Sequence, residues 1–208
     1  MLTLHSVAKE YDLRPVLDDV NLALERGLRY SLSAENGSGK TTLLQIMAGL
    51  SKPTRGKVLW MGQPMSAKQR GLVGVVLQSS FLFGDLTAHE NLSLYATLYG
   101  RPGPHRLATE WLQRIGLEYA GNAFVREFSK GMKQRLALAR AMIHQPQVLL
   151  LDEPFDGLDV QSTKLFQDLL QQSQEAGTAV FLVTHQPTEA SAAHRRFTLK
   201  YGRLVDLP

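Results

Sequence analysis

The sequence predicts an α/β domain with a mainly parallel core sheet, an antiparallel β region and a helical region. The loop AENGSGKT, Ala34 to Thr41, lies directly before the helix-forming run TLLQIMAGL. The runs VLLLDE (148–153) and AVFLVTH (179–185) are short and apolar and end in polar residues, which is typical of buried parallel strands. Residues 1 to about 33 alternate apolar and polar side chains, which indicates antiparallel strands beside the core.

The glycine-rich loop nearly matches the pattern G-x-x-x-x-G-K-[ST]. In such a loop Gly37 and Gly39 let backbone N–H groups approach phosphates, because neither residue has a Cβ in the way. Lys40 reaches the β and γ oxygens, and Thr41 holds magnesium. The loop therefore predicts a site for ATP and Mg²⁺.

One position departs from this pattern, since Ala34 occupies the place of the first glycine. A positive φ there would cost an alanine about 1 kcal/mol. Glu35 also adds a carboxylate near the expected phosphates. The alternative interpretation is a glycine-rich turn ahead of an ordinary helix, so motifs further along the chain must decide.

The middle of the chain predicts two strands followed by helices. TRGKVLWMG (54–62) indicates a turn and a strand, and GVVLQ indicates a strand that ends at Gln78. From about Thr87 to Arg126 the pattern is helical, with a break at Gly100 to Pro104. FSKGMKQR followed by LALARAMIHQP (128–146) predicts another helix, and its Ser-x-Gly start offers free N–H donors.

The strand VLLLDE ends in two carboxylates, where an α/β sheet presents catalytic groups. Asp152 is expected to position magnesium directly or through water. Glu153 is the candidate to orient or deprotonate the attacking water, because phosphoryl transfer needs an in-line nucleophile and neutralised phosphate charge. Its alternative role is an N-cap or loop carboxylate, but a bound cation would relieve the repulsion between the two acids.

Composition agrees with one domain over residues 1–208, of which 44% are hydrophobic. The apolar runs are far shorter than the roughly 20 residues of a membrane-spanning helix, and the start lacks a signal-peptide core. We therefore expect a cytoplasmic chain that reaches a membrane only through partners. The absence of cysteine excludes disulfides and thiolate metal sites, and the net charge of +4 does not indicate nucleic acid.

The order of motifs along the chain resembles the ATP-binding cassette family, and the resemblance covers almost the whole chain. The motifs are the glycine-rich loop, the Ser-x-Gly helix, LLLDEP and a later histidine. The resemblance implies a P-loop fold of the ABC ATPase type, with an antiparallel β subdomain and a helical subdomain at about 87–145. It also implies ATP hydrolysis with Mg²⁺. The working unit would be a homodimer with integral membrane subunits, at the cytoplasmic face of the cell membrane.

The resemblance also implies the roles of individual site residues. They are Tyr11 and Val16 at adenine; Ala34, Glu35, Asn36, Gly37, Ser38, Gly39, Lys40, Thr41 and Thr42 at the phosphates; Thr41, Gln78 and Asp152 at magnesium; Glu153 and His185 at the attacking water; Ser129 and Gly131 at the γ-phosphate bound by the opposite subunit; and Asp159 at the dimer interface.

The family's usual LSGGQ is FSKGM here, so Phe128, Lys130 and Met132 depart from it. Lys130 is either a solvated charge or a phosphate-facing one. SSFLFGDLTAHENL, after Gln78, is apolar and aromatic for a loop. It is either a socket for a cytoplasmic helix of the membrane partner or local core of the helical subdomain.

Finer resemblance concerns the cargo. GLSKPTRGKVLWMGQPM (49–65), LTAHENL, DEPF and THQP are similar to ATP-binding subunits of haem exporters in cytochrome c maturation. SKGMKQR is instead similar to the signature of drug and polysaccharide exporters. Two further alternatives are a soluble assembly ATPase and a regulator that binds ATP without useful turnover. The last is motivated by Ala34, Glu35 and Lys130.

Overall fold

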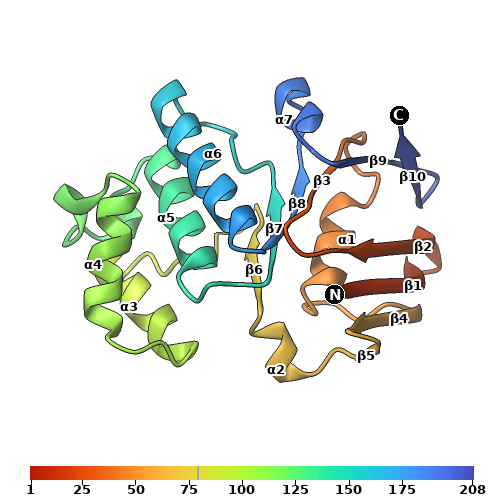
Figure 1. Ribbon diagram of the computed structural model, residues 1–208, viewed down its shortest axis with the longest axis horizontal. Helices are drawn as coiled ribbons and strands as arrows, with labels where there is room; N and C mark the ends of the chain where they lie inside the picture. The colour runs from red at the N-terminus through yellow and green to blue at the C-terminus, as the bar shows by residue number, and fades with distance from the viewer. Residues whose placement is uncertain (79) are drawn as a thin grey trace.

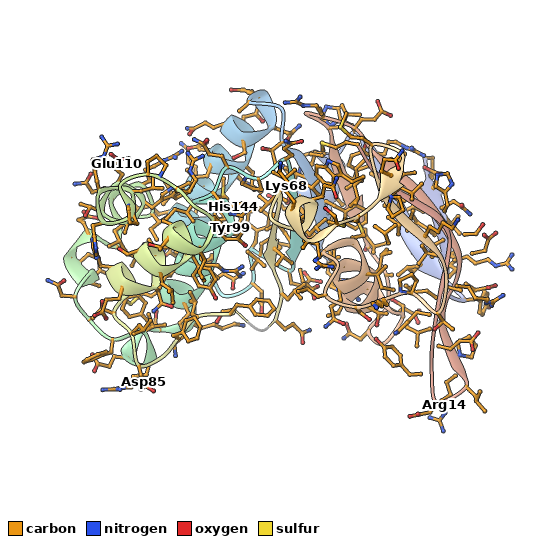
Figure 2. All side chains as sticks on the ribbon, turned by 90° about the horizontal axis from the view of Figure 1, so that it is seen from below. Arg14, Lys68, Asp85, Tyr99, Glu110 and His144 are labelled. Carbon is orange, nitrogen blue, oxygen red and sulfur yellow. The ribbon has the colours of Figure 1, made fainter. Side chains whose placement is uncertain are left out.

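The computed structural model describes residues 1–78 and 80–208, and Ser79 of the segment after Gln78 lies outside the described residues. Two sheets and a helical subdomain form an elongated molecule (Figure 1). Arg14 in the β-rich part and Glu110 in the helical part lie near its opposite ends (Figure 2). No helix in the described part of the chain is long and apolar enough to cross a membrane.

The core sheet has six strands in the order β10-β9-β3-β8-β7-β6. The pairs β3–β9, β3–β8, β7–β8 and β6–β7 are parallel, and only the β9–β10 pair is antiparallel. All side chains of β7 and β8 are buried, as expected for central strands covered on both faces. The strands are β3 (Arg29–Leu32), β6 (Val73–Val76), β7 (Val148–Asp152), β8 (Ala179–Val183), β9 (Arg195–Lys200) and β10 (Arg203–Leu207).

The second sheet is antiparallel, with the order β2-β1-β4-β5. Its strands are β1 (Leu2–Tyr11), β2 (Arg14–Leu24), β4 (Arg55–Trp60) and β5 (Gln63–Pro64). The expectation that residues 1 to about 33 all belong to this sheet was wrong for β3, which pairs in the core sheet. All four residues of β3 are buried, which fits an interior strand better than a half-exposed one.

Helix α1 (Lys40–Met47) lies between the two sheets and fills the core that they share (Figure 1). The short helix α2 (Ala67–Arg70) follows β5. Helix α6 (Val160–Glu175) lies on the same side of the core sheet as the helical subdomain, and α7 (Pro187–Ser191) follows β8.

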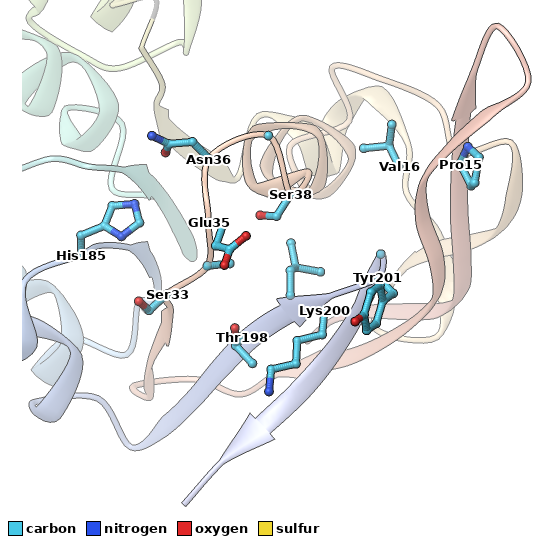
Figure 3. Close-up of a pocket in the computed structure, with 14 residues that line it drawn as sticks. Pro15, Val16, Ser33, Glu35, Asn36, Ser38, His185, Thr198, Lys200 and Tyr201 are labelled. Carbon is cyan, nitrogen blue, oxygen red and sulfur yellow. The ribbon is translucent and has the colours of Figure 1, made fainter.

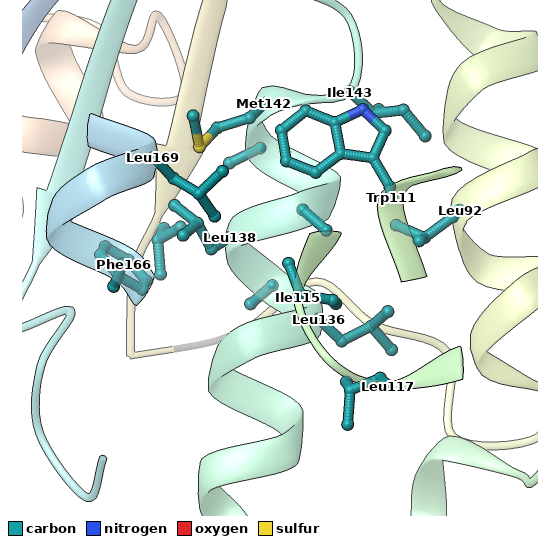
Figure 4. Close-up of a cluster of buried hydrophobic side chains, with 14 of the residues drawn as sticks. Leu92, Trp111, Ile115, Leu117, Leu136, Leu138, Met142, Ile143, Phe166 and Leu169 are labelled. Atoms are coloured by element: carbon teal, nitrogen blue, oxygen red, sulfur yellow. The ribbon is translucent and has the colours of Figure 1, made fainter. Parts of the chain in front are cut away.

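The helical subdomain contains α3 (Ala88–Leu98), α4 (Pro104–Arg114) and α5 (Lys130–Met142), with short 3₁₀ turns at Glu118–Ala120 and Val125–Glu127. Thr87 and Glu90 form a capping box at the start of α3. Trp111, Ile115 and Leu136 belong to the buried cluster that joins these helices to each other and to the core sheet (Figure 4). The subdomain therefore shares one continuous core with the strands that carry the site.

Candidate nucleotide-binding site

The glycine-rich loop joins the end of β3 to the start of α1. Gly37 and Gly39 have φ values of 78° and 103°, a region that favours glycine. A Cβ on Gly39 would lie 2.9 Å from Val16 Cγ1, so this glycine is required by space as well as by conformation. The strain considered for Ala34 does not arise, because its φ is not positive, and its side chain joins the core instead.

Lys40 is nearly buried inside this loop. Its ammonium donates hydrogen bonds to the carbonyl oxygens of Ala34 at 2.6 Å and Glu35 at 2.9 Å. These bonds hold the charge against the loop backbone, at the start of α1, where free N–H groups also favour an anion. The carboxylate of Glu35 belongs to an exposed residue, so it does not compete for this ammonium.

Two oxygen ligands meet beside the loop. Thr41 Oγ1 donates a hydrogen bond to Asp152 Oδ2 at 2.9 Å, although the residues are 111 positions apart. Asp152 is 5% exposed at the end of β7. A hydroxyl and a carboxylate fit the oxygen chemistry of Mg²⁺. The described residues hold no group of three His, Cys or acidic side chains that would bind a metal by themselves, so phosphate oxygens would have to complete this shell.

Glu153 and His185 lie next to these ligands. His185 Nε2 is 3.1 Å from Glu153 Oε1. Burial raises the pKa of the Glu153 carboxyl, and the neighbouring His185 opposes that shift. Glu153 also has a φ of 48°, a conformation that costs a non-glycine residue of order 1–3 kcal/mol and occurs mainly at functional sites. His185 lies two residues beyond the end of β8, not within it as expected.

A cavity of about 490 Å³ connects Glu153 with Thr41, Asp152 and the glycine-rich loop, a volume typical of small-ligand sites. It brings together residues that sequence analysis assigned separately to adenine, phosphate, magnesium and water. They are Tyr11, Val16, Asn36, Gly37, Gly39, Lys40, Thr41, Thr42, Gln78, Asp152 and Glu153. Tyr11 lines this cavity and is 44% exposed, and the Lys9 ammonium lies over its ring, 4.8 Å from the centroid.

A larger cavity of about 1010 Å³ lies on the other side of the loop (Figure 3). It contains Ala34, Glu35, Ser38 and His185 together with residues that sequence analysis missed, including Ser33, Thr198 and Lys200. No local signal could have found Thr198 and Lys200, because β9 reaches the loop only through pairing with β3. The loop thus forms a wall between two cavities.

The Ser-x-Gly motif does not join either cavity. Ser129 is exposed and caps α5, its Oγ accepting a hydrogen bond from Met132 N at 3.2 Å. Gly131 packs against the loop DGLD (156–159), because a Cβ on it would lie 3.2 Å from Gly157 O. Within one chain, therefore, the structure separates this motif from the other predicted site residues.

The polar groups of the DGLD loop have partners of their own. Lys130 forms an exposed ion pair with Asp156, with 2.6 Å between Nζ and Oδ2, so it is a surface charge in this structure. Asp159 caps α6 by accepting a hydrogen bond from Ser162 N at 2.7 Å. This bond holds the pKa of the Asp159 carboxyl below its usual value. Its role at a dimer interface remains a prediction.

A buried ion pair supports the segment that carries His185, and sequence analysis missed it. Glu189 of α7 accepts hydrogen bonds from Arg29 of β3 and from Gln167 of α6. The side chains of Arg29 and Glu189 are 9% and 3% exposed. Because breaking a buried pair is costly, this contact ties α7 to the core sheet four residues after His185.

The fold and the cavity define a P-loop nucleotide-binding domain. A family model described as ABC transporter matches residues 17–156, more than half of the chain. The chain therefore belongs to the ABC transporter family, with the fold of an ABC ATPase. This confirms the predicted fold class, and it identifies the chain as an ATP-binding, ATP-hydrolysing cassette.

Similar proteins cover nearly the whole chain. The lipoprotein-releasing system ATP-binding protein LolD of Shewanella oneidensis is 35% identical, over 98% of this chain and 95% of LolD. The Nod factor export ATP-binding protein I of Burkholderia pseudomallei is 36% identical, over 96% of this chain and 67% of that protein. The spermidine/putrescine import ATP-binding protein PotA of Chromobacterium violaceum is 34% identical, over 100% of this chain and 59% of PotA. These names span release, export and import, so they do not select one cargo.

Solved structures agree. An ATP-binding subunit of an ABC transporter superposes with a TM-score of 0.92 and 28% identity, covering 100% of this chain and 89% of that one. The ATP-binding cassette MJ0796, described as a dimeric post-hydrolysis state bound to ADP and Pi, has a TM-score of 0.90 and 30% identity. The match covers 100% of this chain and 98% of MJ0796.

Proposed function

We propose that this chain is the ATP-hydrolysing subunit of an ABC transporter complex, acting with Mg²⁺ as a homodimer beneath integral membrane subunits at the cytoplasmic face. The observation that carries the proposal is the meeting of Thr41, Asp152 and Glu153 with Lys40 at one cavity. These are the groups that phosphoryl transfer requires, in one place and with the expected chemistry.

Each of these residues has a defined task. Lys40 exchanges its carbonyl partners for phosphate oxygens and neutralises their charge. Thr41 and Asp152, with Gln78 at the cavity edge, hold Mg²⁺, which would neutralise the charge that develops on the phosphates. Glu153 orients the attacking water and accepts its proton, and its raised pKa makes it a better base than an exposed glutamate. His185 steadies that carboxylate.

The dimer follows from the separation of the two halves of the site. Ser129 offers a capped helix N-terminus to solvent, away from its own chain's cavity. An anion bound by the phosphate loop of one chain fits the start of α5 of a second chain. The dimeric, ADP- and Pi-bound relative with 30% identity supports this arrangement. Loss of the γ-phosphate contact would then let the two chains separate.

The segment after Gln78 is the proposed contact with the membrane subunits. Phe81 and Phe83 are 40% and 49% exposed, although Phe83 also packs near Tyr95 with ring centroids 6.2 Å apart. Both alternatives for this segment therefore have a basis, since it is anchored in the helical subdomain and still presents aromatic surface. Asn91 fixes its backbone, because Asn91 Oδ1 accepts a hydrogen bond from Phe83 N and Asn91 Nδ2 donates one to Phe83 O.

For the cargo we propose the haem-related export complex of cytochrome c maturation, in which ATP hydrolysis releases a haem-loaded chaperone. The support is the resemblance of the segments 49–65, LTAHENL, DEPF and THQP. The signature SKGMKQR favours a polysaccharide or drug exporter instead, and the likeness to a Nod factor export protein agrees with that alternative. A soluble assembly ATPase or a non-hydrolysing regulator would have no multi-span partner or no turnover, respectively.

The test is purification of the complex from membranes in mild detergent, identification of its subunits and measurement of Mg²⁺-dependent ATP hydrolysis. Glu153→Gln should lower kcat by orders of magnitude, retain ATP and trap a closed dimer. Glu118→Gln, an exposed glutamate of the helical subdomain, is the matched control. Turnover in Glu153→Gln equal to the control would remove Glu153 from catalysis, and a different membrane pair would keep the transporter but change the cargo.

A further inference from the structure

Arg140 of α5 is a buried cation without an acid. The residue is 3% exposed, yet its guanidinium makes no ion pair with any carboxylate among the described residues. One nitrogen donates a hydrogen bond to Ser80 O at 3.0 Å, and Nε has no partner in the described part of the chain. A buried charge is costly unless it is paired, so this arrangement requires a reason.

The surroundings of Arg140 are cationic and aromatic. Its guanidinium carbon lies 5.3 Å from the centre of the Phe81 ring and 5.5 Å from that of Tyr95. His144, two residues beyond the end of α5, stacks on Tyr99 with ring centroids 3.9 Å apart (Figure 2). Burial, followed by the charges of Arg140 and Arg101, lowers the pKa of His144 to about 4. Every charged group identified around His144 is therefore positive, and the region is suited to an anion.

Phe81 covers this region in a strained conformation. It has a φ of 52°, which is unusual for a bulky side chain, and it is 40% exposed although its ring lies over the guanidinium. The Tyr95 hydroxyl donates a hydrogen bond to Phe81 O, which helps to hold the backbone there. Strain of this kind persists where two arrangements of a segment serve function.

We propose that a carboxylate on a cytoplasmic segment of the membrane subunit enters beside Phe81 and forms an ion pair with Arg140. This inference rests on the proposed membrane partner and specifies the chemistry of its contact. The aromatic rings of Phe81 and Phe83 supply apolar contact area, and Arg140 selects an acidic side chain at the centre.

Entry of the carboxylate links docking to catalysis. Pairing compensates the buried charge and displaces Phe81, which relieves its backbone strain. Phe81 is only three residues from Gln78, which lines the cavity together with Asp152 and Glu153. Movement of Phe81 therefore changes the position of a residue at the proposed magnesium site. A membrane-subunit segment without the acid would bind both positions of Phe81 equally well. It would therefore not shift the equilibrium between them.

The first step of the test is photo-crosslinking in the purified membrane complex, with benzoylphenylalanine in place of Phe83 so that Phe81 is intact. The crosslinked peptide is sequenced. We expect a membrane subunit with an Asp or Glu within about one helical turn of the crosslinked residue. A crosslink to a soluble protein, to a second copy of the chain or to a segment without an acid overturns the inference.

The second step is a double-mutant cycle. A synthetic peptide of the crosslinked segment is measured with its acid intact or changed to the amide, against wild type and Arg140→Met. We expect either change alone to weaken peptide binding about tenfold or more. The two changes together should weaken binding little more than one change alone. The proposal is overturned if the two fold-losses in peptide affinity multiply in the double change, or if Arg140→Met binds the peptide as tightly as wild type. Arg114→Met, which removes an arginine stacked at 4.4 Å on Trp111, is the matched control.

Thermal unfolding of the isolated chain separates docking from a structural role. If Arg140 serves docking, Arg140→Met should leave Tm unchanged or raise it, because methionine removes an unpaired buried charge. A large fall in Tm would assign Arg140 to holding the Ser80 backbone and overturn the inference. If the wild-type complex hydrolyses ATP but Arg140→Met is stimulated equally by the membrane subunits, only this inference fails. Absence of hydrolysis or of a membrane subunit would refute the proposed function itself.

Discussion

His144 should make the chain lose stability in mildly acidic solution. The residue is 8% exposed, and neither ring nitrogen has a hydrogen-bond partner among the described residues. Burial lowers its pKa from 6.5 to about 4. The unfolded chain therefore binds a proton at this histidine as pH falls below its ordinary pKa, whereas the folded chain binds it only near pH 4. Stability from the neutral imidazole is thus present above about pH 6.5 and is lost as pH falls towards 4.

The size of the effect follows from the shift. At about 1.4 kcal/mol per pKa unit, the full loss is about 3 kcal/mol, and by pH 5 it is about 2 kcal/mol. His144→Phe keeps an aromatic ring against Tyr99 but cannot take up a proton. When the pH falls from 8 to 5, the free energy of unfolding of wild type should fall by about 2 kcal/mol more than that of His144→Phe. This difference does not depend on the stability of the variant at pH 8.

The assay is urea unfolding followed by tryptophan fluorescence, with wild type and variant measured at both pH values. Comparing the two proteins cancels other groups that titrate in this range. His5→Phe, which removes an exposed histidine of β1, is the control and should leave the difference between the two pH values as in wild type. An identical pH dependence in wild type and His144→Phe would refute the reasoning.

Three further predictions concern the site. Gly39→Ala should lower Tm at least twice as much as Gly37→Ala, because a Cβ on Gly39 meets an atom at 2.9 Å whereas one on Gly37 meets none within 4 Å; equal losses in calorimetry would contradict this. Glu153→Gln should raise Tm above wild type at pH 8 but not at pH 4. The raised pKa of Glu153 means that its stabilising contribution is present at low pH and is lost as pH rises through the folded-state value, and a fixed Tm difference would refute this. Lys130→Ala should hardly change Tm, since its ion pair is exposed, and a fall of many degrees would show that the pair is structural.

Three features could be found from sequence, because each is encoded in contiguous residues: the phosphate loop, the carboxylates at the end of β7 and the helix capped by Ser129. A short apolar run that ends in acids indicates a buried parallel strand and its carboxyl edge. That rule and the loop pattern together predicted that Asp152 and Thr41 hold the same magnesium ion, and the structure places their oxygens 2.9 Å apart. Periodicity likewise located the helical region, which contains α3, α4 and α5.

Other features depended on contacts between distant segments, and no local pattern contained them. Alternation placed β3 in the antiparallel sheet, but its neighbours are β8 and β9, and only that pairing brings Lys200 beside the phosphate loop. The side chain of Ala34 proved compatible with its backbone conformation only once φ was known.

By itself, the sequence determined the class of the protein and the chemistry of its site, because backbone conformation and residue type act locally. Only the tertiary structure decided which charges have partners. Lys130 forms an ion pair with Asp156 and Arg29 forms one with Glu189, whereas Arg140 pairs with no acid within the described chain. The cost of a buried charge depends on every group packed around it, and packing is a property of the folded molecule, not of any one segment.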